Sequence, residues 1–211
     1  MFYLGIYLIV ALSSAMLITW IAKYILAPLG RGGVKRKFIT LASFAILLAF
    51  TLFLHLRSYP IQAQAALLVY ASWGMSISII DYFVLRFDIR TQIAGLIICF
   101  TCGYLLNGLQ VALLGGLLGL LAGSAIYFGG RIFQERKKLG AIPFGIGDVT
   151  IIALICMVTG PQDLLWVLLI GLVFSIMIGF FHNRIKKGLA TGPVPLIPGF
   201  VLASFVALII R

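Results

Sequence analysis

The 211-residue chain is 63% hydrophobic and only 10% charged. A soluble domain is about half apolar and about one-quarter charged, so the surface of this chain cannot be solvated by water alone and lipid must cover much of it. The net charge of +11 would suit a nucleic-acid partner, but charge argues for a partner only once its placement along the chain is known. The composition therefore predicts an all-α, polytopic bundle in the lipid bilayer.

Eight apolar segments predict a bundle of about eight transmembrane helices. A spanning helix takes about 20 residues, and only one of the segments, at about 148–159, is clearly short. A short helix at membrane depth is tolerated where protein rather than lipid surrounds it. We expect an N-terminal helix pair over 1–60, joined by a short basic loop, and a six-helix core over 61–211. The eight segments lie at about 2–25, 38–56, 61–85, 91–107, 110–130, 148–159, 163–183 and 194–210.

The basic residues predict the orientation of this bundle. Of the 16 lysines and arginines, all but Arg57 and Arg211 fall on alternate connections between the predicted helices. Connections rich in Lys and Arg stay on the cytoplasmic side, so both termini are expected outside. Without the short helix at about 148–159, the basic residues near 184–187 would lie on the wrong face. Topology therefore accounts for the positive charge, and no nucleic-acid partner is expected.

Two of the five acidic residues stand out, because they lie in or beside apolar runs. Asp81 is embedded in an apolar segment, and Asp148 follows Phe-Gly-Ile-Gly and begins another. Glu135 and Asp163 fall in predicted loops. In the predicted topology Asp81 is near the cytoplasmic end of one helix and Asp148 near the cytoplasmic start of another. An ionisable group inside the membrane is costly and is a candidate for a functional site.

These two aspartates are compatible with three kinds of role. If the carboxyl groups meet, they share a proton, and one can activate water while the other polarises a peptide carbonyl, as in two-aspartate proteases. A proton- or cation-coupled transporter also places Asp residues within the membrane. In a purely structural role, Asp148 caps a helix and Asp81 reaches toward Arg86 or a water-filled vestibule. The residues alone leave all three open.

Several motifs in order along residues 70–205 resemble a known family. The pentapeptide Gly145–Val149 resembles the GxGD motif of membrane aspartyl proteases, and Asp81 lies two helices earlier. Between them, Leu114–Gly123 is similar to the Gly-rich helix of the type IV prepilin and preflagellin peptidases, and Arg131–Lys138 to their basic loop. The segment Gly192–Phe200 is similar to the Pro/Gly-rich opening of the family's last helix.

The chain departs from the family pattern in two places. The Ile-Pro that follows the first catalytic Asp is replaced by Phe87-Asp88, so Asp88 is the alternative to Asp81 as that residue. The four cysteines of a cytoplasmic zinc domain, linked to N-methylation in many bacterial members, are missing. The resemblance therefore implies a peptidase without methyltransferase activity. Two spans separate Asp81 from Asp148, which favours the prepilin branch over the presenilin branch.

The resemblance implies an aspartic endopeptidase of a prokaryotic cell membrane. Its substrates would be type IV pilin-like or archaellin precursors, cut at the cytoplasmic face to release a short basic leader. Asp81 and Asp148 would be catalytic, and no metal or organic cofactor is expected. The alternative function remains a small proton- or cation-coupled transporter. The residues expected to contact the substrate are Gly145, Gly147, Pro195, Pro198 and Gly199.

Overall fold

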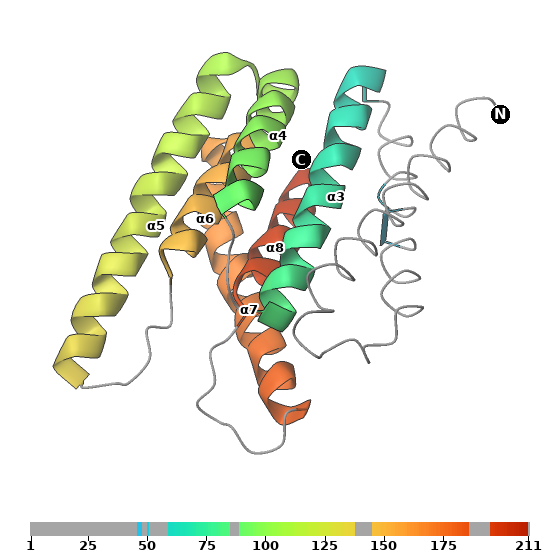
Figure 1. Ribbon diagram of the computed structural model, residues 1–211. Coiled ribbons are helices and arrows are strands. Elements are labelled where there is room, and N and C mark those ends of the chain that lie inside the picture. Colours follow the sequence, from blue (N-terminus) through green and yellow to red (C-terminus); the bar gives the residue numbers. More distant parts are fainter. Residues whose placement is uncertain are drawn as a thin grey trace.

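The computed structural model describes residues 46, 47, 50, 59–84, 89–137, 145–185 and 195–210. Over these residues the chain is all-α (Figure 1). The elements are α3 (Ile61–Val84), α4 (Ile89–Asn107), α5 (Leu109–Lys137), α6 (Ile146–Thr159), the 3-10 helix η2 (Pro161–Asp163), α7 (Leu164–Ile185) and α8 (Ile197–Ile210).

All six helices predicted for the core are confirmed. The helices predicted at 2–25 and 38–56 lie outside the described residues, except for residues 46, 47 and 50. The prediction of eight helices and of an N-terminal pair over 1–60 therefore stays a prediction.

Four helices are long and apolar enough to cross a bilayer, namely α3, α4, α5 and α7. The chain is a multi-pass membrane protein, as its composition predicts. The remaining two, α6 and α8, are apolar but have 14 residues each. At about 1.5 Å per residue, 14 residues rise about 21 Å, which is less than the ~30 Å of a hydrocarbon core.

Successive helices alternate in direction, because their connections are short. In Figure 1, α3, α5 and α7 descend while α4, α6 and α8 ascend. Gly108 alone separates α4 from α5, and its φ of +82° lies in the left-handed region that favours glycine. The Gly108 N–H donates to the Tyr104 carbonyl oxygen at 2.9 Å. This bond satisfies one of the carbonyl groups that lack a partner in the last turn of α4.

One end of the bundle carries the positive charge. We call it the basic end: here α3, α5 and α7 end, and α4, α6 and α8 begin (Figure 1). Within the described part of the chain, every lysine and arginine belongs to it: Arg90, Arg131, Arg136, Lys137 and Arg184. This distribution agrees with the predicted orientation, in which the basic end is cytoplasmic.

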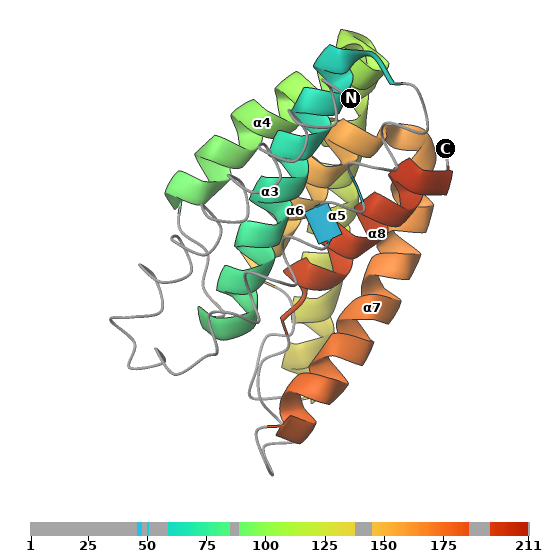
Figure 2. The ribbon, with the colours of Figure 1, turned by 90° about the vertical axis from the view of Figure 1, so that its right-hand side faces the viewer.

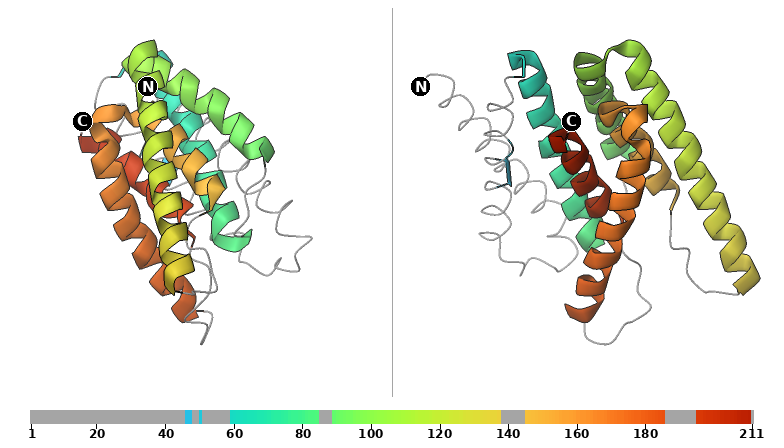
Figure 3. Two further views of the ribbon diagram at one scale, coloured as in Figure 1. Left: turned by 90° about the vertical axis from the view of Figure 1, so that its left-hand side faces the viewer. Right: turned by 180° about the vertical axis from the view of Figure 1, so that it is seen from behind.

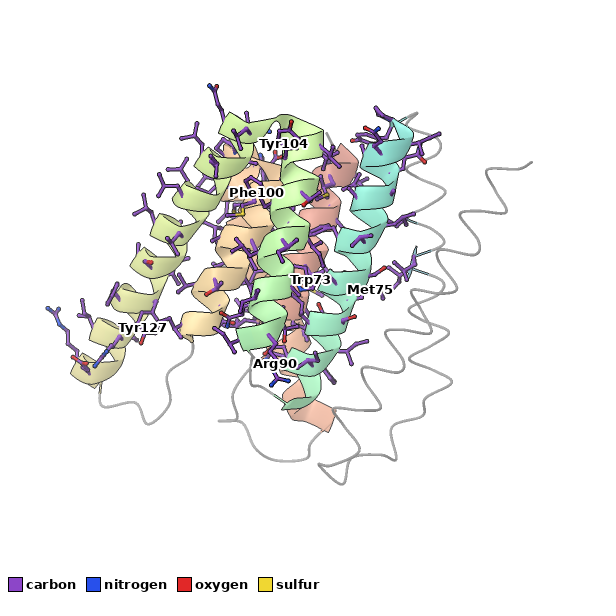
Figure 4. All side chains as sticks on the ribbon, turned by 45° about the horizontal axis from the view of Figure 1, so that its top comes forward. Trp73, Met75, Arg90, Phe100, Tyr104 and Tyr127 are labelled. Atoms are coloured by element: carbon purple, nitrogen blue, oxygen red, sulfur yellow. The ribbon has the colours of Figure 1, made fainter. Side chains whose placement is uncertain are left out.

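The helices divide into a buried centre and an apolar rim. In α6 and α8, nine of 14 residues each are buried, so the short helices are enclosed largely by protein, as predicted for α6. In α4, α5 and α7, by contrast, less than a third of the most apolar stretch is buried. Their large apolar side chains point outward over most of their length (Figure 4), a surface that lipid covers.

Glycines bring α5 unusually close to α6. A Cβ on Gly115 would collide with the Cys156 carbonyl oxygen, and one on Gly119 would lie 2.9 Å from the Cα of Ala153. A Cβ on Gly123, one turn further, would lie 3.1 Å from the Cα of Val149. Small residues at this spacing let two helix backbones approach where lipid offers no hydrophobic drive between helices. The seam formed by Gly115, Gly119 and Gly123 therefore fixes α6 against α5.

Polar contacts join α3 to its neighbours inside the bundle. The Trp73 indole lies between α3 and α4 (Figure 4) and donates to the Thr91 carbonyl oxygen at 3.2 Å. Gly95 leaves room for that ring, since a Cβ there would overlap it. The fully buried Tyr70 hydroxyl donates to Ser204 of α8 at 2.6 Å. These contacts hold α3 beside both α4 and α8.

Candidate functional site

Asp81 lies in the last turns of α3, at the basic end, and is buried with 8% of its surface exposed. Its Oδ2 accepts a hydrogen bond of 3.0 Å from the backbone N–H of Ile197, the first residue of α8. The backbone of Leu196 also interacts with this carboxyl group. The first N–H groups of a helix have no partner within the helix and favour negative charge. Asp81 therefore satisfies the start of α8, and α8 in turn holds Asp81.

Asp148 is the third residue of α6, at the same end of the bundle. Its Oδ2 accepts the N–H of Gly145 at 2.7 Å, and its own N–H donates to the Gly145 carbonyl oxygen at 3.1 Å. Gly145 is thus the N-cap of α6, and Asp148 reaches back to it in the manner of a capping box. The carboxyl group is only partly buried, and this capping contact is the structural role that the sequence left open.

The two carboxyl groups come from helices that are far apart in the chain, and both lie at the basic end of the bundle. The negative charge of Asp148 acts on the Asp81 carboxyl group, although no hydrogen bond joins the two side chains among the described residues. Both α8 and α4 pack against α3 and α6 and so link the helices that carry the two acids (Figure 2). The direct contact partners of the two groups are backbone N–H donors at the starts of α8 and α6. The arrangement therefore places two acids of different exposure beside two helix N-termini.

The helices of the described chain reach to different levels at the basic end. Both α5 and α7 extend further toward that end than the starts of α6 and α8 (Figure 3). Because α6 and α8 are short, their first turns begin inside the bundle rather than at its edge. Asp81 and Asp148 therefore lie deeper than the charged residues at the end of α5.

The other predicted site residues surround the starts of these two helices. Gly145 is exposed and Gly147 half-buried at the start of α6. Pro195 is buried and Pro198 half-buried at the start of α8. Their predicted role in substrate binding stays a prediction. Asp88, the alternative to Asp81, lies outside the described residues.

Gly199 is buried in the contact between α8 and α7. A Cβ there would overlap the Ser175 Oγ and would lie 2.6 Å from the Gly171 carbonyl oxygen. Close helix packing is therefore sufficient reason for a glycine at this position. Its predicted contact with a substrate remains untested.

The other two acidic residues in the described part of the chain, Glu135 and Asp163, do not contact this pair. Glu135 belongs to the last turns of α5, not to a loop, and its Oε1 accepts from the Arg131 Nε at 3.2 Å in an exposed pair. Such pairs contribute little to stability. Asp163 lies in η2, between the end of α6 and the start of α7, at the opposite end of the bundle. Asp163 therefore serves as a control position in experiments that replace Asp81 or Asp148.

Two residues near Asp81 were not among the predicted site residues. Ile197 contacts Asp81 directly, and Ser175 contacts the neighbouring Leu196. Ile197 contributes a backbone N–H, which almost any residue type supplies, so the sequence could not identify it. Ser175 is fully buried in α7, and its hydroxyl lies 2.9 Å from the Leu196 carbonyl oxygen. The sequence could have identified Ser175, because it is a polar residue inside an otherwise apolar run.

Comparison of the chain with protein-family models, with curated proteins and with solved structures gives no match.

Proposed function

We propose that this protein is a membrane-embedded aspartic endopeptidase of the GxGD type. It cleaves the leader from type IV pilin-like or archaellin precursors at the cytoplasmic face of a prokaryotic cell membrane. The observation that carries the proposal is that Asp81 and Asp148 lie at the same end of the bundle, each bonded to a backbone N–H at the start of a short helix. The basic residues gathered at that end support its assignment to the cytoplasm.

The chemistry needs one ionised and one protonated aspartate. Two carboxyl groups that approach a single peptide bond do not both ionise cheaply, so the proposed mechanism has them share one proton. The ionised group takes a proton from water as the water oxygen attacks the peptide carbon, while the protonated group donates to the carbonyl oxygen. The resulting tetrahedral intermediate then breaks its C–N bond as the leaving nitrogen accepts a proton. This route requires no metal or organic cofactor.

The depth of the site suits a substrate that is itself a membrane helix. A precursor would place its apolar helix in the bilayer beside the bundle and direct its leader into the basic end. The starts of α6 and α8 lie deeper than the ends of α5 and α7 (Figure 3), which supports cleavage close to the point where such a leader meets its helix. Gly145 and Gly147 present little side-chain bulk beside Asp148, which would let an extended backbone approach. The substrate backbone would pass between Asp148 and the start of α8. There, Pro195, Pro198 and Gly199 would contact it from the other side.

A small proton- or cation-coupled transporter is the second candidate, and one observation favours it. Short helices that begin inside the membrane, with charged groups at their N-termini, also build the ion sites of carriers. A carrier predicts transport that follows an ion gradient, whereas a dyad protease works without a gradient. The position of both aspartates at one end, rather than at mid-bundle, supports the protease.

The proposal is tested by co-expressing a prepilin-like precursor with the wild-type protein or with single variants in membranes. Asp81→Asn and Asp148→Asn are each expected to abolish trimming of the precursor while the protein still inserts. Asp163→Asn is the matched control, because Asp163 lies at the opposite end, and it should trim normally. Asp88→Asn runs alongside and is expected to retain activity.

Two outcomes contradict parts of this account. If Asp88→Asn is inactive and Asp81→Asn is active, the first catalytic aspartate is Asp88. If no precursor in a panel is trimmed by the wild-type protein, the protease proposal fails and the transporter proposal takes its place.

A further inference from the structure

The carboxyl group of Asp81 is held by a different helix from the one that carries it. Its Oδ2 accepts a hydrogen bond from the Ile197 N–H of α8, at 3.0 Å. The terminal torsion of an aspartate side chain is broad, so a carboxyl group without a partner has no single orientation. The orientation of Asp81 therefore depends on where α8 begins.

The start of α8 is in turn fastened to α7. The Ser175 hydroxyl lies 2.9 Å from the Leu196 carbonyl oxygen and 2.7 Å from the Gly171 carbonyl oxygen of its own helix. One hydroxyl proton serves one of these acceptors at a time. The Gly199 Cα packs directly against Ser175, leaving no space for a side chain. The Leu196 carbonyl oxygen also accepts the Gly199 N–H of α8 at 3.1 Å, so Ser175 ties an already capped helix start to α7, one residue before the N–H that reaches Asp81.

We propose that Ile197 and Ser175 are positioning residues for Asp81. The Ser175 hydroxyl anchors Leu196, and the adjacent Ile197 N–H then sets the orientation of the Asp81 carboxyl group relative to Asp148. The chain of contacts runs from α7 through the first turn of α8 to α3, and each link is a hydrogen bond or a close backbone contact. This inference rests on the proposed function, and it adds two residues that act through Asp81.

The first test removes the N–H donor without changing the helix. Ile197→Pro does this, because proline has no N–H and is well tolerated at the first position of a helix. Ile197→Val is the matched control, since valine keeps the N–H and is close to proline in size. A hydrogen bond to a charged group is worth enough that kcat of Ile197→Pro should fall by about 10- to 100-fold. The Val variant should stay within about threefold of wild type, and KM should change little in either.

The second test weakens the anchor on α7 and serves also if Ile197→Pro does not fold. Ser175→Ala should lower kcat by about threefold to tenfold with KM nearly unchanged, because a neutral hydrogen bond is lost. Ser72→Ala is the control. The Ser72 hydroxyl is also buried and donates at 2.7 Å to the Leu68 carbonyl oxygen of its own helix, so its loss should leave kcat unchanged.

The outcomes separate this inference from the proposed function. If the wild-type protein cleaves the precursor and both Ile197→Pro and Ser175→Ala match their controls, the positioning role is wrong and the protease stands. If either variant raises KM while kcat is unchanged, its residue serves substrate binding and the positioning role is again wrong. If the wild-type protein cleaves no precursor, the proposed function fails and the positioning role fails with it.

Discussion

The glycine seam between α5 and α6 gives a stability prediction with a built-in control. A Cβ on Gly115 would collide with the Cys156 carbonyl oxygen and lie 3.0 Å from the carbonyl carbon and 3.3 Å from the Gly160 Cα. All three are backbone atoms, so no side chain can rotate away. Gly115→Ala must therefore move α5 away from α6 by about 1 Å, and a gap of that size forfeits about a quarter to a half of the dispersion attraction along the contact.

We expect Gly115→Ala to lower the free energy of unfolding by about 1–3 kcal/mol, the usual cost of overpacking. Gly129→Ala is the matched control on the same helix, because a Cβ there meets nothing within 4 Å. Alanine is the better helix former, so this variant should be neutral or more stable by up to about 1 kcal/mol. Reversible unfolding of the purified protein in mixed micelles, followed by circular dichroism, measures both.

The sign of the difference between these two variants is the decisive result. If Gly115→Ala is as stable as Gly129→Ala, α5 and α6 are not in the close contact described here. The placement of α6 by that seam would then be wrong.

Three further predictions concern the core and the topology. Tyr70→Phe removes the hydroxyl that donates to Ser204 and should lower the free energy of unfolding by about 1 kcal/mol; Tyr104→Phe, at an exposed position on α4, should change it by less, and equal losses would contradict the buried bond. Asn107→Ala removes the 2.7 Å bond from its Nδ2 to the Val158 carbonyl oxygen and should cost about 1–2 kcal/mol in the same assay, whereas an unchanged stability would argue against this link between α4 and α6. A fluorescent protein that matures only in the cytoplasm, fused to the C-terminus, should stay dark; bright cells would reverse the predicted orientation.

The six described helices could be predicted from apolar length and from the placement of basic residues. The short helix α6 depended on both: its length alone was insufficient, but the basic residues after α7 required another crossing. The buried faces could not be predicted in the same way. In α5 and α7 nearly every position within the membrane is apolar, so periodicity does not separate a side chain facing lipid from one facing protein. The seam at Gly115, Gly119 and Gly123 follows only from the position of α6.

The candidate site was predictable to the extent that it depends on unusual residues. Asp81 was identified as a charge within an apolar run, and Asp148 from its motif, and the structure places both at the same end. Their partners could not be identified, because the N–H groups of Ile197 and Gly145 are backbone atoms that any residue except proline supplies. Gly199 was expected at the substrate, yet its surroundings on α7 give it a packing role that sequence position does not reveal.

Cleavage by the purified protein in liposomes, with no ion gradient, tests the central claim most directly. A prepilin-like precursor is incubated with wild-type protein, Asp81→Asn, Asp148→Asn or the control Asp163→Asn, and the products are identified by mass spectrometry. The account predicts one cut at the leader junction by the wild-type and Asp163→Asn proteins, and intact precursor with the other two. Cleavage by both Asp81→Asn and Asp148→Asn would contradict it, as would an intact precursor in every sample.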